Sequence, residues 1–108
     1  MTRPWRLTRQ AEESLTEIAL WTYETFGPAQ AEAYEAELLA CCEGIAAGEA
    51  VTQGCDVLVP GAEGLLFARA GGHYVVFVER DGAVVVVDVV HQRMDLGRRV
   101  RELGRSGA

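Results

Sequence analysis

Two short turn signals in the second half of the chain constrain its fold more than any other feature of the sequence. Gly71-Gly72 and Asp81-Gly82 are two-residue turns of the kind that joins antiparallel strands, because glycine accepts the positive φ that such turns require. Three stretches rich in β-branched and aromatic residues flank these turns: Leu65–Ala70, His73–Arg80 and Ala83–His91. The sequence therefore predicts three consecutive strands in an antiparallel meander.

The first half of the chain has the periodicity of helices. Thr8 is the predicted N-cap of a first helix, in which apolar residues recur at spacings of three and four as far as Phe26. Gly27-Pro28 ends this helix and starts a second one, which we expect to run to about Ala47. A connection of only two residues forces the two helices into an antiparallel hairpin.

Three further segments complete the pattern. Trp5-Arg6-Leu7-Thr8 alternates between apolar and polar residues and predicts a short strand. Residues 48–63 are rich in glycine and contain Pro60, which predicts an irregular connection with a short extended piece at Asp56–Val59. Met94–Leu103 is expected to form a short Arg-rich helix that Gly104 ends.

The predicted order is β-α-α-β-β-β, with the short helix in the tail. We expect a two-layer α+β domain in which the first strand joins the sheet and the helical hairpin covers one face. Val84–Val87 is apolar on both faces, which predicts a central strand covered on each side. With 108 residues there is room for one core, so we expect a single domain over residues 1–96 and a basic C-terminal tail over residues 97–108.

The apolar residues are too dispersed for a membrane protein. No uninterrupted apolar run, Ala83–Val87 included, exceeds five residues, whereas a membrane-spanning helix needs about 20. Arg3, Arg6 and Arg9 leave no apolar core behind Met1 of the kind found in secretion signals. These features predict a cytoplasmic protein.

Cofactor and metal signals are missing from the sequence. Cys41, Cys42 and Cys55 are an odd number with one adjacent pair, so they predict small buried side chains, not a disulfide framework or a zinc site. The sequence has no phosphate-binding loop, dinucleotide fingerprint or HExxH pattern. We therefore expect no cofactor and no metal.

The charge is unevenly distributed. The chain has ten arginines, no lysine and a net charge of −6. Residues 1–90 have five arginines against fourteen acidic residues, a net charge of −9, whereas residues 91–108 have a net charge of +3. An acidic body argues against a broad nucleic-acid-binding face and suggests a protein partner, with the tail as a contact surface.

Two side chains have both a chemical and a structural interpretation. His91, with Arg93 nearby, could perform acid–base chemistry on RNA, or it could simply hydrogen-bond across the sheet. Arg69 on the first meander strand is either a charge that protects an exposed edge or a contact for a partner. His73, beside the glycine turn, is expected to be solvated.

The segment that closes the meander, Val90-His91-Gln92-Arg93-Met94-Asp95, resembles the final-strand motif of the ParE toxins in the RelE/ParE superfamily. The resemblance covers about residues 4–96, and the other segments that share it follow in the family's order: Arg6-Leu7-Thr8 with Ala11, Glu12, Leu15 and Ile18, then Gly27-Pro28 with Ala29, Ala31 and Tyr34, then Gly64-Leu65, then His73-Tyr74-Val75-Val76-Phe77.

This resemblance implies the toxin of a type II toxin–antitoxin pair. ParE-like toxins act on DNA gyrase and are neutralised by a ParD-like antitoxin, which implies a hetero-oligomer with that antitoxin. RelE-like relatives instead cut mRNA on the ribosome. RelE-like toxins do this with basic and acid–base residues on the sheet. In this sequence, only His91, Arg93, Arg69 and Tyr74 could take those roles. A net charge of −6 also favours the gyrase-directed branch, which lacks nuclease chemistry.

The expected sites follow from this assignment. The expected target-binding surface consists of His91, Arg93, Asp95, Arg98, Arg99 and Arg101. The antitoxin is expected in the groove between the hairpin and the sheet, or on a sheet edge, with Leu65, Phe67 and Arg69 in contact. As alternatives, the chain is a ribosome-dependent nuclease with His91 and Tyr74 as acid and base and Arg69 and Arg93 on phosphate, or an inactive relic that only binds antitoxin.

Overall fold

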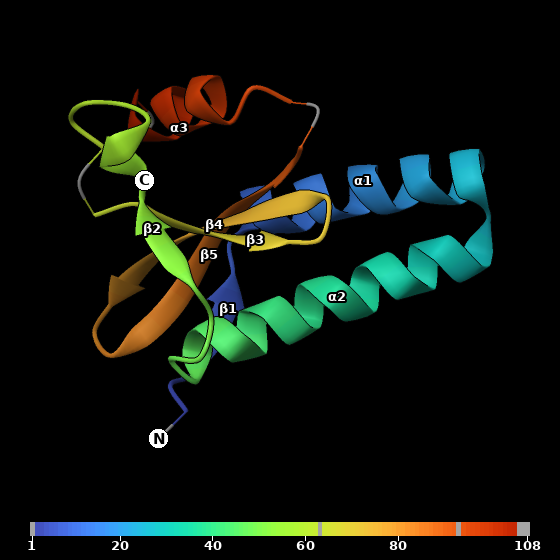
Figure 1. The fold of residues 1–108 in the computed structure, drawn as a ribbon, viewed down its shortest axis with the longest axis horizontal. Coiled ribbons are helices and arrows are strands. Elements are labelled where there is room, and N and C mark those ends of the chain that lie inside the picture. Colours follow the sequence, from blue (N-terminus) through green and yellow to red (C-terminus); the bar gives the residue numbers. More distant parts are fainter. Residues whose placement is uncertain (1, 63, 93, 106–108) are drawn as a thin grey trace.

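The computed structural model describes residues 2–62, 64–92 and 94–105 of the chain (Figure 1). In chain order its elements are β1 (Trp5–Leu7), α1 (Arg9–Phe26), α2 (Pro28–Ala46), β2 (Thr52–Gly54), the 3-10 turn η1 (Cys55–Val57), β3 (Leu66–Ala70), β4 (His73–Arg80), β5 (Ala83–His91) and α3 (Leu96–Arg105). The predicted α+β fold is confirmed. No helix in the described residues is both long and apolar enough to cross a membrane.

The hairpin of α1 and α2 forms where the sequence predicts it. The Thr8 hydroxyl accepts a hydrogen bond from the Ala11 amide at 3.2 Å and so caps the first turn of α1. Gly27 has a φ of +91°, which disfavours any side chain, and Pro28 starts α2 directly after it. The two helices run antiparallel and extend beyond the sheet (Figure 1).

In the described residues, one five-stranded sheet has the order β1-β5-β4-β3-β2. The β3-β4-β5 meander is antiparallel as predicted, and β1 pairs with β5 in parallel. The expected irregular connection is corrected at two points. Thr52–Gly54 forms β2 by pairing with Leu66–Ala68, and the extended piece expected at Asp56–Val59 is instead largely η1 and a turn. The sequence of Thr52–Gly54 has no strand pattern. This segment forms a strand because it pairs with the unpaired backbone groups at the edge of β3.

Both faces of the sheet are covered. The hairpin packs on one face, in a core that includes Leu38, Ile45 and Phe77. On the other face, a second core includes Val100 and Leu103 of α3. β5 is buried from Val84 to Val90, as predicted for a central strand covered on each side.

A one-residue bulge interrupts β5. Val76 on β4 pairs with Asp88, but the next residue, Phe77, pairs with Val86, so Val87 is an extra residue in the ladder. The alternation of side chains between the two faces shifts at this point: Val86 faces the hairpin before the bulge and Val89 faces it afterwards. Every residue of β5 beyond the bulge therefore points to the face opposite the one that simple alternation predicts.

Candidate partner-binding site

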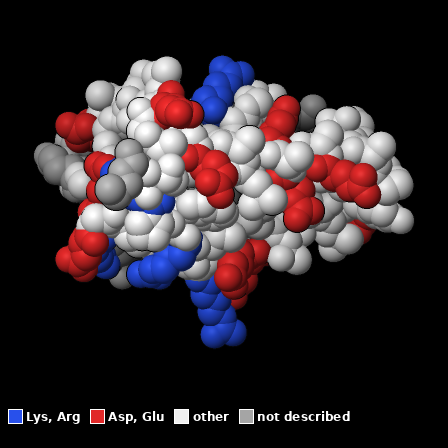
Figure 2. Space-filling model, turned by 90° about the horizontal axis from the view of Figure 1, so that it is seen from below, with Lys and Arg blue, Asp and Glu red and all other residues white. Residues whose placement is uncertain are grey.

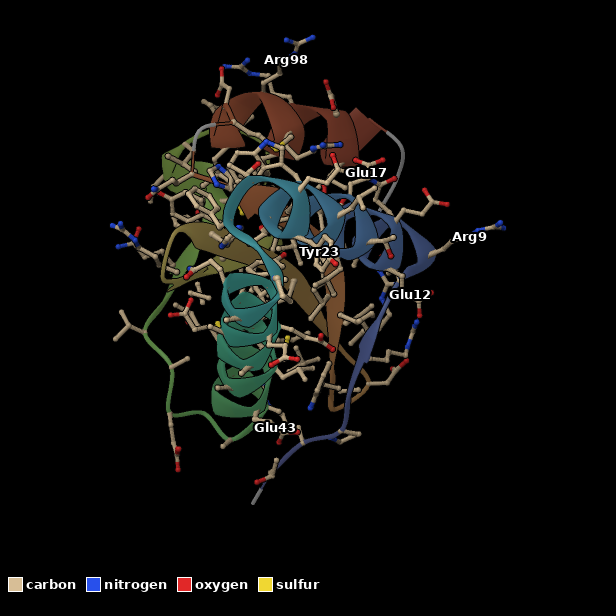
Figure 3. The ribbon with its side chains drawn as sticks, turned by 90° about the vertical axis from the view of Figure 1, so that its right-hand side faces the viewer. Arg9, Glu12, Glu17, Tyr23, Glu43 and Arg98 are labelled. Atoms are coloured by element: carbon tan, nitrogen blue, oxygen red, sulfur yellow. The ribbon has the colours of Figure 1, made fainter. Side chains whose placement is uncertain are left out.

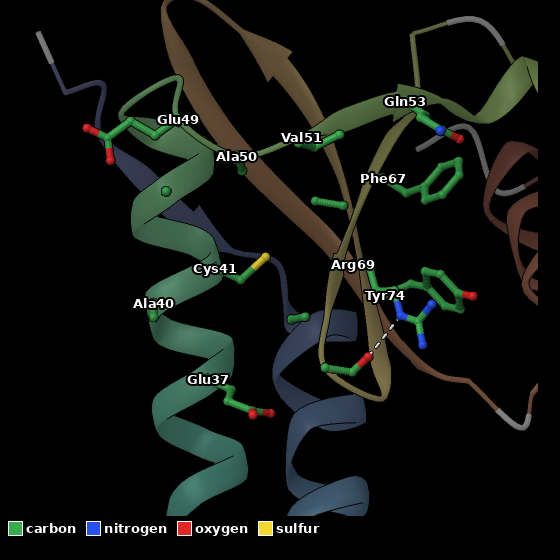
Figure 4. Close-up of a pocket in the computed structure, with 14 residues that line it drawn as sticks. Glu37, Ala40, Cys41, Glu49, Ala50, Val51, Gln53, Phe67, Arg69 and Tyr74 are labelled. Atoms are coloured by element: carbon green, nitrogen blue, oxygen red, sulfur yellow. Dashed lines mark hydrogen bonds between the residues drawn. The ribbon is translucent and has the colours of Figure 1, made fainter.

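An open groove, here named the edge groove, lies between α2 and the β3 edge of the sheet (Figure 4). Its volume is about 700 Å³. Because β2 pairs only with Leu66–Ala68, β3 continues past it with Arg69 and Ala70 at the edge. Peptide groups at an uncovered edge can pair with a strand of another chain. The edge groove is therefore the candidate site for a protein partner.

Small side chains on α2 keep this groove open. Ala40, Cys41 and Gly44 line its helical wall, and the close-up shows Cys41 directed across the groove toward the strands (Figure 4). At the sheet side, Phe67 and Tyr74 contact each other edge to face, with ring centroids 6.0 Å apart. An apolar side chain of a partner would find space between these two walls.

Charged groups also line the edge groove. Glu37 and Glu49 lie on the helix and loop side, and Arg69 lies on the strand side. The Arg69 Nε donates a hydrogen bond to the Gly71 carbonyl at 3.0 Å, which fixes the guanidinium beside the β3–β4 turn.

The three residues expected to contact an antitoxin do not all lie at the same site. Phe67 and Arg69 both line the edge groove. Leu65 does not line it: this side chain is 5% exposed and packs in the core under α3, because it precedes β3 and turns inward beside Cys55. Leu65 can therefore act on a partner only through the packing of β3.

His73 is buried, which corrects the expectation that it is solvated. His73 follows the glycine turn but is the first residue of β4 and faces the hairpin. The centroid of its ring lies 4.3 Å from that of Tyr34. Burial, with a smaller effect from nearby His91, lowers the pKa of His73 to about 4. This imidazole is neutral at pH 7.

His91 and Tyr74 lie on opposite faces of the sheet. His91 pairs with His73, and its ring lies 5.3 Å from that of Trp21 on α1, on the hairpin face. Tyr74 packs with the core of the opposite face, next to Phe67. Arg69 is the cross-strand partner of Tyr74. The expected acid–base residues therefore do not form a single site.

The residues expected to bind a target have different roles around α3. The Asp95 carboxylate accepts a hydrogen bond from the Arg98 amide at 3.1 Å, so it caps the start of α3. Arg98 and Arg101 are exposed, and Arg98 points away from the body of the molecule (Figure 3). Arg93 lies outside the described residues.

Arg99 belongs to a buried network that the sequence analysis missed. Its Nε lies 3.3 Å from the carboxylate of Asp88, which is fully buried. The same carboxylate accepts hydrogen bonds from the Ser14 hydroxyl at 2.5 Å and from the Val89 amide at 2.8 Å. Asp88 thereby joins α1, β5 and α3. The available signal was one acidic residue within an otherwise apolar run, Val84–Val90.

The three cysteines are free thiols. Cys42 and Cys55 are buried as expected, and burial raises the pKa of Cys42 to about 12 and that of Cys55 to about 11. Both are protonated at pH 7 and act as small core side chains. Cys41 is partly exposed at the edge groove, and burial also raises its pKa.

Sequence comparisons agree with this architecture. The family described as the ParE toxin of the type II toxin-antitoxin system, parDE, matches residues 5–96. Toxin ParE1 of Mycobacterium tuberculosis is 36% identical over 101 residues, which cover 93% of this chain and 100% of that protein. Toxin ParE of Escherichia coli is 36% identical over 97 residues, which cover 89% of this chain and 91% of that protein.

A solved structure is similar in fold. The chromosomal ParDE TA system from P. aeruginosa contains a chain that superposes with a TM-score of 0.66 at 15% identity, over 83% of this chain and 96% of the other. The fold and the edge groove thus define a class: a small α+β domain in which a helical hairpin packs on a sheet and a groove opens beside the β3 edge. Within that class, the chain belongs to the ParE toxin family of type II toxin–antitoxin systems.

Proposed function

We propose that this toxin inhibits DNA gyrase by protein binding, acts in the cytoplasm without chemistry of its own, and is neutralised by a ParD-like antitoxin. Membership of the ParE family supports the proposal. The observation that carries it is the placement of His91 and Tyr74 on opposite faces of the sheet. A general acid and a general base must both reach the same reacting group, and these two side chains are separated by the sheet itself.

The proposed target surface is the exposed side of α3. This helix has four arginines against one glutamate. Arg98 and Arg101 are exposed, and such charges accelerate association with an anionic gyrase–DNA surface. Arg99 supports this surface from beneath, because its guanidinium is paired with buried Asp88. Asp95 supports it as the helix cap.

The test is induced expression of the chain, with growth, the DNA-damage response and translation followed together. Gyrase inhibition predicts filamentation and a DNA-damage response while translation continues. The double variant Arg98→Ala and Arg101→Ala should lose at least tenfold of its potency against purified gyrase in a supercoiling assay. Arg99 is left intact in this variant so that the fold is preserved.

The matched control removes two exposed arginines outside α3, Arg6 of β1 and Arg80 of β4, with the same change of charge. Equal losses in the two double variants would contradict a specific α3 surface. Immediate mRNA cleavage would replace gyrase inhibition with the nuclease alternative. Soluble protein without any growth defect would indicate an inactive relic that binds antitoxin.

The proposed antitoxin site is the edge groove. A segment of the antitoxin would extend the sheet at Arg69–Ala70 and place an apolar side chain between Cys41 and Phe67. This placement agrees with the expectation of an antitoxin along the hairpin–sheet groove or on a sheet edge.

Two alanines on α2 provide a matched test of this site. Ala40 and Ala36 are both exposed and lie one turn apart, but only Ala40 lines the edge groove. Ala40→Arg should weaken antitoxin binding at least tenfold and restore toxicity on co-expression, whereas Ala36→Arg should remain neutralised. Full neutralisation of Ala40→Arg would exclude the edge groove as the antitoxin site.

A further inference from the structure

The connection between β2 and β3 displays two large aliphatic side chains to solvent. We name residues 55–62 and 64–65 of this connection the η1 loop, after the 3-10 turn at its start. Val57 is 70% exposed and the next residue, Leu58, is 42% exposed. Neither side chain lines the edge groove. Adjacent apolar side chains that stay at the surface of a folded domain are typical of a contact with another protein.

The backbone of the η1 loop is fixed by hydrogen bonds and by buried anchors. The Cys55 amide donates a hydrogen bond to the Leu65 carbonyl at 2.8 Å, which closes the loop at its two ends. The amides of Leu58 and Val59 both donate to the Cys55 carbonyl at 3.0 Å. Cys55 is 0% exposed and Leu65 is 5% exposed, so both ends are held in the core. A contact that is ordered before binding costs little conformational entropy when the partner arrives.

The η1 loop is a neighbour of α3. Cys55 and Val59 pack in the same core as Val100 and Leu103 of that helix. The green turn of η1 accordingly lies next to α3 in Figure 1. Because Arg101 of α3 is exposed, the aliphatic pair of the loop adjoins the basic helix that forms the proposed target surface.

The hairpin also has exposed apolar side chains, but its charge is different. Leu20 is 57% exposed and Leu39 is 45% exposed. Residues 10–46 contain no lysine or arginine. The far end of the hairpin shows acidic and uncharged surface (Figure 2). Exposed aliphatic groups and exposed arginines therefore come together at the η1 loop and α3, and not at the end of the hairpin.

From this combination we propose that Val57 and Leu58 are the apolar anchor of the target surface and enter an apolar recess on a protein subunit of gyrase. The exposed arginines of α3 meet carboxylates beside that recess. This inference rests on the proposed function and deepens it. An apolar centre with a polar rim is the usual arrangement of a protein–protein interface, in which rim charges speed association and the apolar centre slows release.

The composition of the loop favours a protein over DNA as its contact. Residues 55–65 contain two acidic residues and no basic residue. Asp56 is exposed and directly precedes Val57. Contacts with DNA phosphates require cationic or hydrogen-bond-donating groups, and a carboxylate at the surface repels them. Aliphatic side chains gain nothing from a phosphate, whereas they are desolvated in an apolar recess of a protein.

A matched pair of double variants tests the anchor with the full chain, gyrase holoenzyme and plasmid DNA. Val57→Gln with Leu58→Gln removes two exposed aliphatic side chains beside α3. Leu20→Gln with Leu39→Gln removes two from the hairpin, and neither pair changes the charge. In a supercoiling assay, the loop variant should lose at least tenfold of its inhibitory potency, and the hairpin variant should lose less than about twofold.

Two results of this assay overturn the anchor: wild-type potency of the loop variant, or equal losses in both variants. A wild-type chain that does not inhibit gyrase would contradict the proposed function itself. The two failures are therefore distinguishable.

Titration calorimetry separates a protein contact from a DNA contact. The chain is titrated into gyrase without DNA, and into duplex DNA without gyrase, at about 50 mM and about 300 mM salt. The loop variant should lose gyrase binding by the same factor at both salt concentrations, because apolar contacts are not screened. The loss in the Arg98→Ala and Arg101→Ala variant should shrink as salt is raised. Normal binding of the loop variant to gyrase with weakened binding to DNA would overturn the proposal.

Two controls address the fold and the antitoxin. Val57→Gln alone changes the more exposed position, so it should leave urea unfolding unchanged and still lose about threefold of the potency. The loop double variant should bind a ParD-like antitoxin with unchanged affinity in calorimetry. Loss of antitoxin binding with full gyrase inhibition would assign the η1 loop to the antitoxin and overturn the proposal.

Discussion

The two faces of the sheet are held by different forces. On the hairpin face, two long helices bury aliphatic and aromatic side chains such as Leu38 and Ile45. On the opposite face, the short helix α3 contributes two deeply buried residues, Val100 and Leu103, and one ion pair, between Arg99 and Asp88. Burial of a large apolar area is insensitive to any single charge, whereas the packing of a short helix that depends partly on an ion pair with a buried carboxylate is sensitive to a single charge substitution.

The two faces also differ in charge. Residues 9–46, which form the hairpin, have eight glutamates and one arginine, while α3 has four arginines and one glutamate. The covering of one face is therefore acidic and that of the other is basic. Charge complementarity would therefore favour cationic partners at the hairpin and anionic partners at α3.

The largest expected effect tests whether apolar burial stabilises the hairpin face. Leu38→Ala should lower the free energy of unfolding by about 3 to 4 kcal/mol, because it leaves a cavity at a fully packed position that is 3% exposed. The neighbouring Leu39 is the matched control, and Leu39→Ala should cost less than about 1 kcal/mol. Urea unfolding measures both, and equal costs would show that the hairpin face is not held by its buried core.

The next largest effect tests the ion pair between Arg99 and Asp88 on the opposite face. Arg99→Gln should cost about 2 to 3 kcal/mol, because it leaves the buried carboxylate of Asp88 without its cation. Arg98 is its neighbour on the same helix and is paired only at the surface with Glu102, so Arg98→Gln should cost about 0.5 kcal/mol or less.

The same ion pair predicts a non-additive double variant. Asp88→Asn combined with Arg99→Gln should be less destabilising than the sum of the two single changes, because no unpaired charge is then left in the interior. Strict additivity in urea unfolding would show that Arg99 and Asp88 do not interact, and the contrast between the two faces would be lost.

The smallest effect depends on pH and arises where His73 packs against the hairpin. Because the pKa of His73 is about 4 in the folded protein and 6.5 when unfolded, the unfolded chain binds more protons between these values. The stability that neutral His73 contributes to the folded protein is therefore lost as the pH falls from about 6.5 to about 4. Between pH 7 and pH 5, this residue should lower the free energy of unfolding by about 2 kcal/mol.

The reference for this measurement is His73→Phe, which keeps an aromatic ring against Tyr34 but cannot titrate. Urea unfolding of the two proteins at pH 7 and pH 5 isolates the effect of His73 from that of the acidic side chains. Parallel losses of stability in both proteins would show that His73 is protonated freely in the fold.

The sequence predicted the elements whose signals are local. The glycine turns at residues 71–72 and 81–82 specified the meander, and the bounds predicted for His73–Arg80 and Ala83–His91 agree with β4 and β5. The Thr8 cap and Gly27-Pro28 specified the hairpin. Membership of the ParE family was also evident from short motifs in the right order. The division at residue 96 stays a prediction, although α3 packs into the same molecule.

The sequence by itself determined the order of the elements, because caps, turns and periodicity act within a few residues of the chain. Only the tertiary structure decided how side chains from distant elements meet. The bulge at Val87 turns His91 toward the hairpin and away from Tyr74. Asp88 contacts Ser14 of α1 and Arg99 of α3, which lie far from it in the sequence. One inserted residue reverses the alternation of a strand without leaving a mark in its apolar pattern, and a buried charge selects its partner by proximity in space.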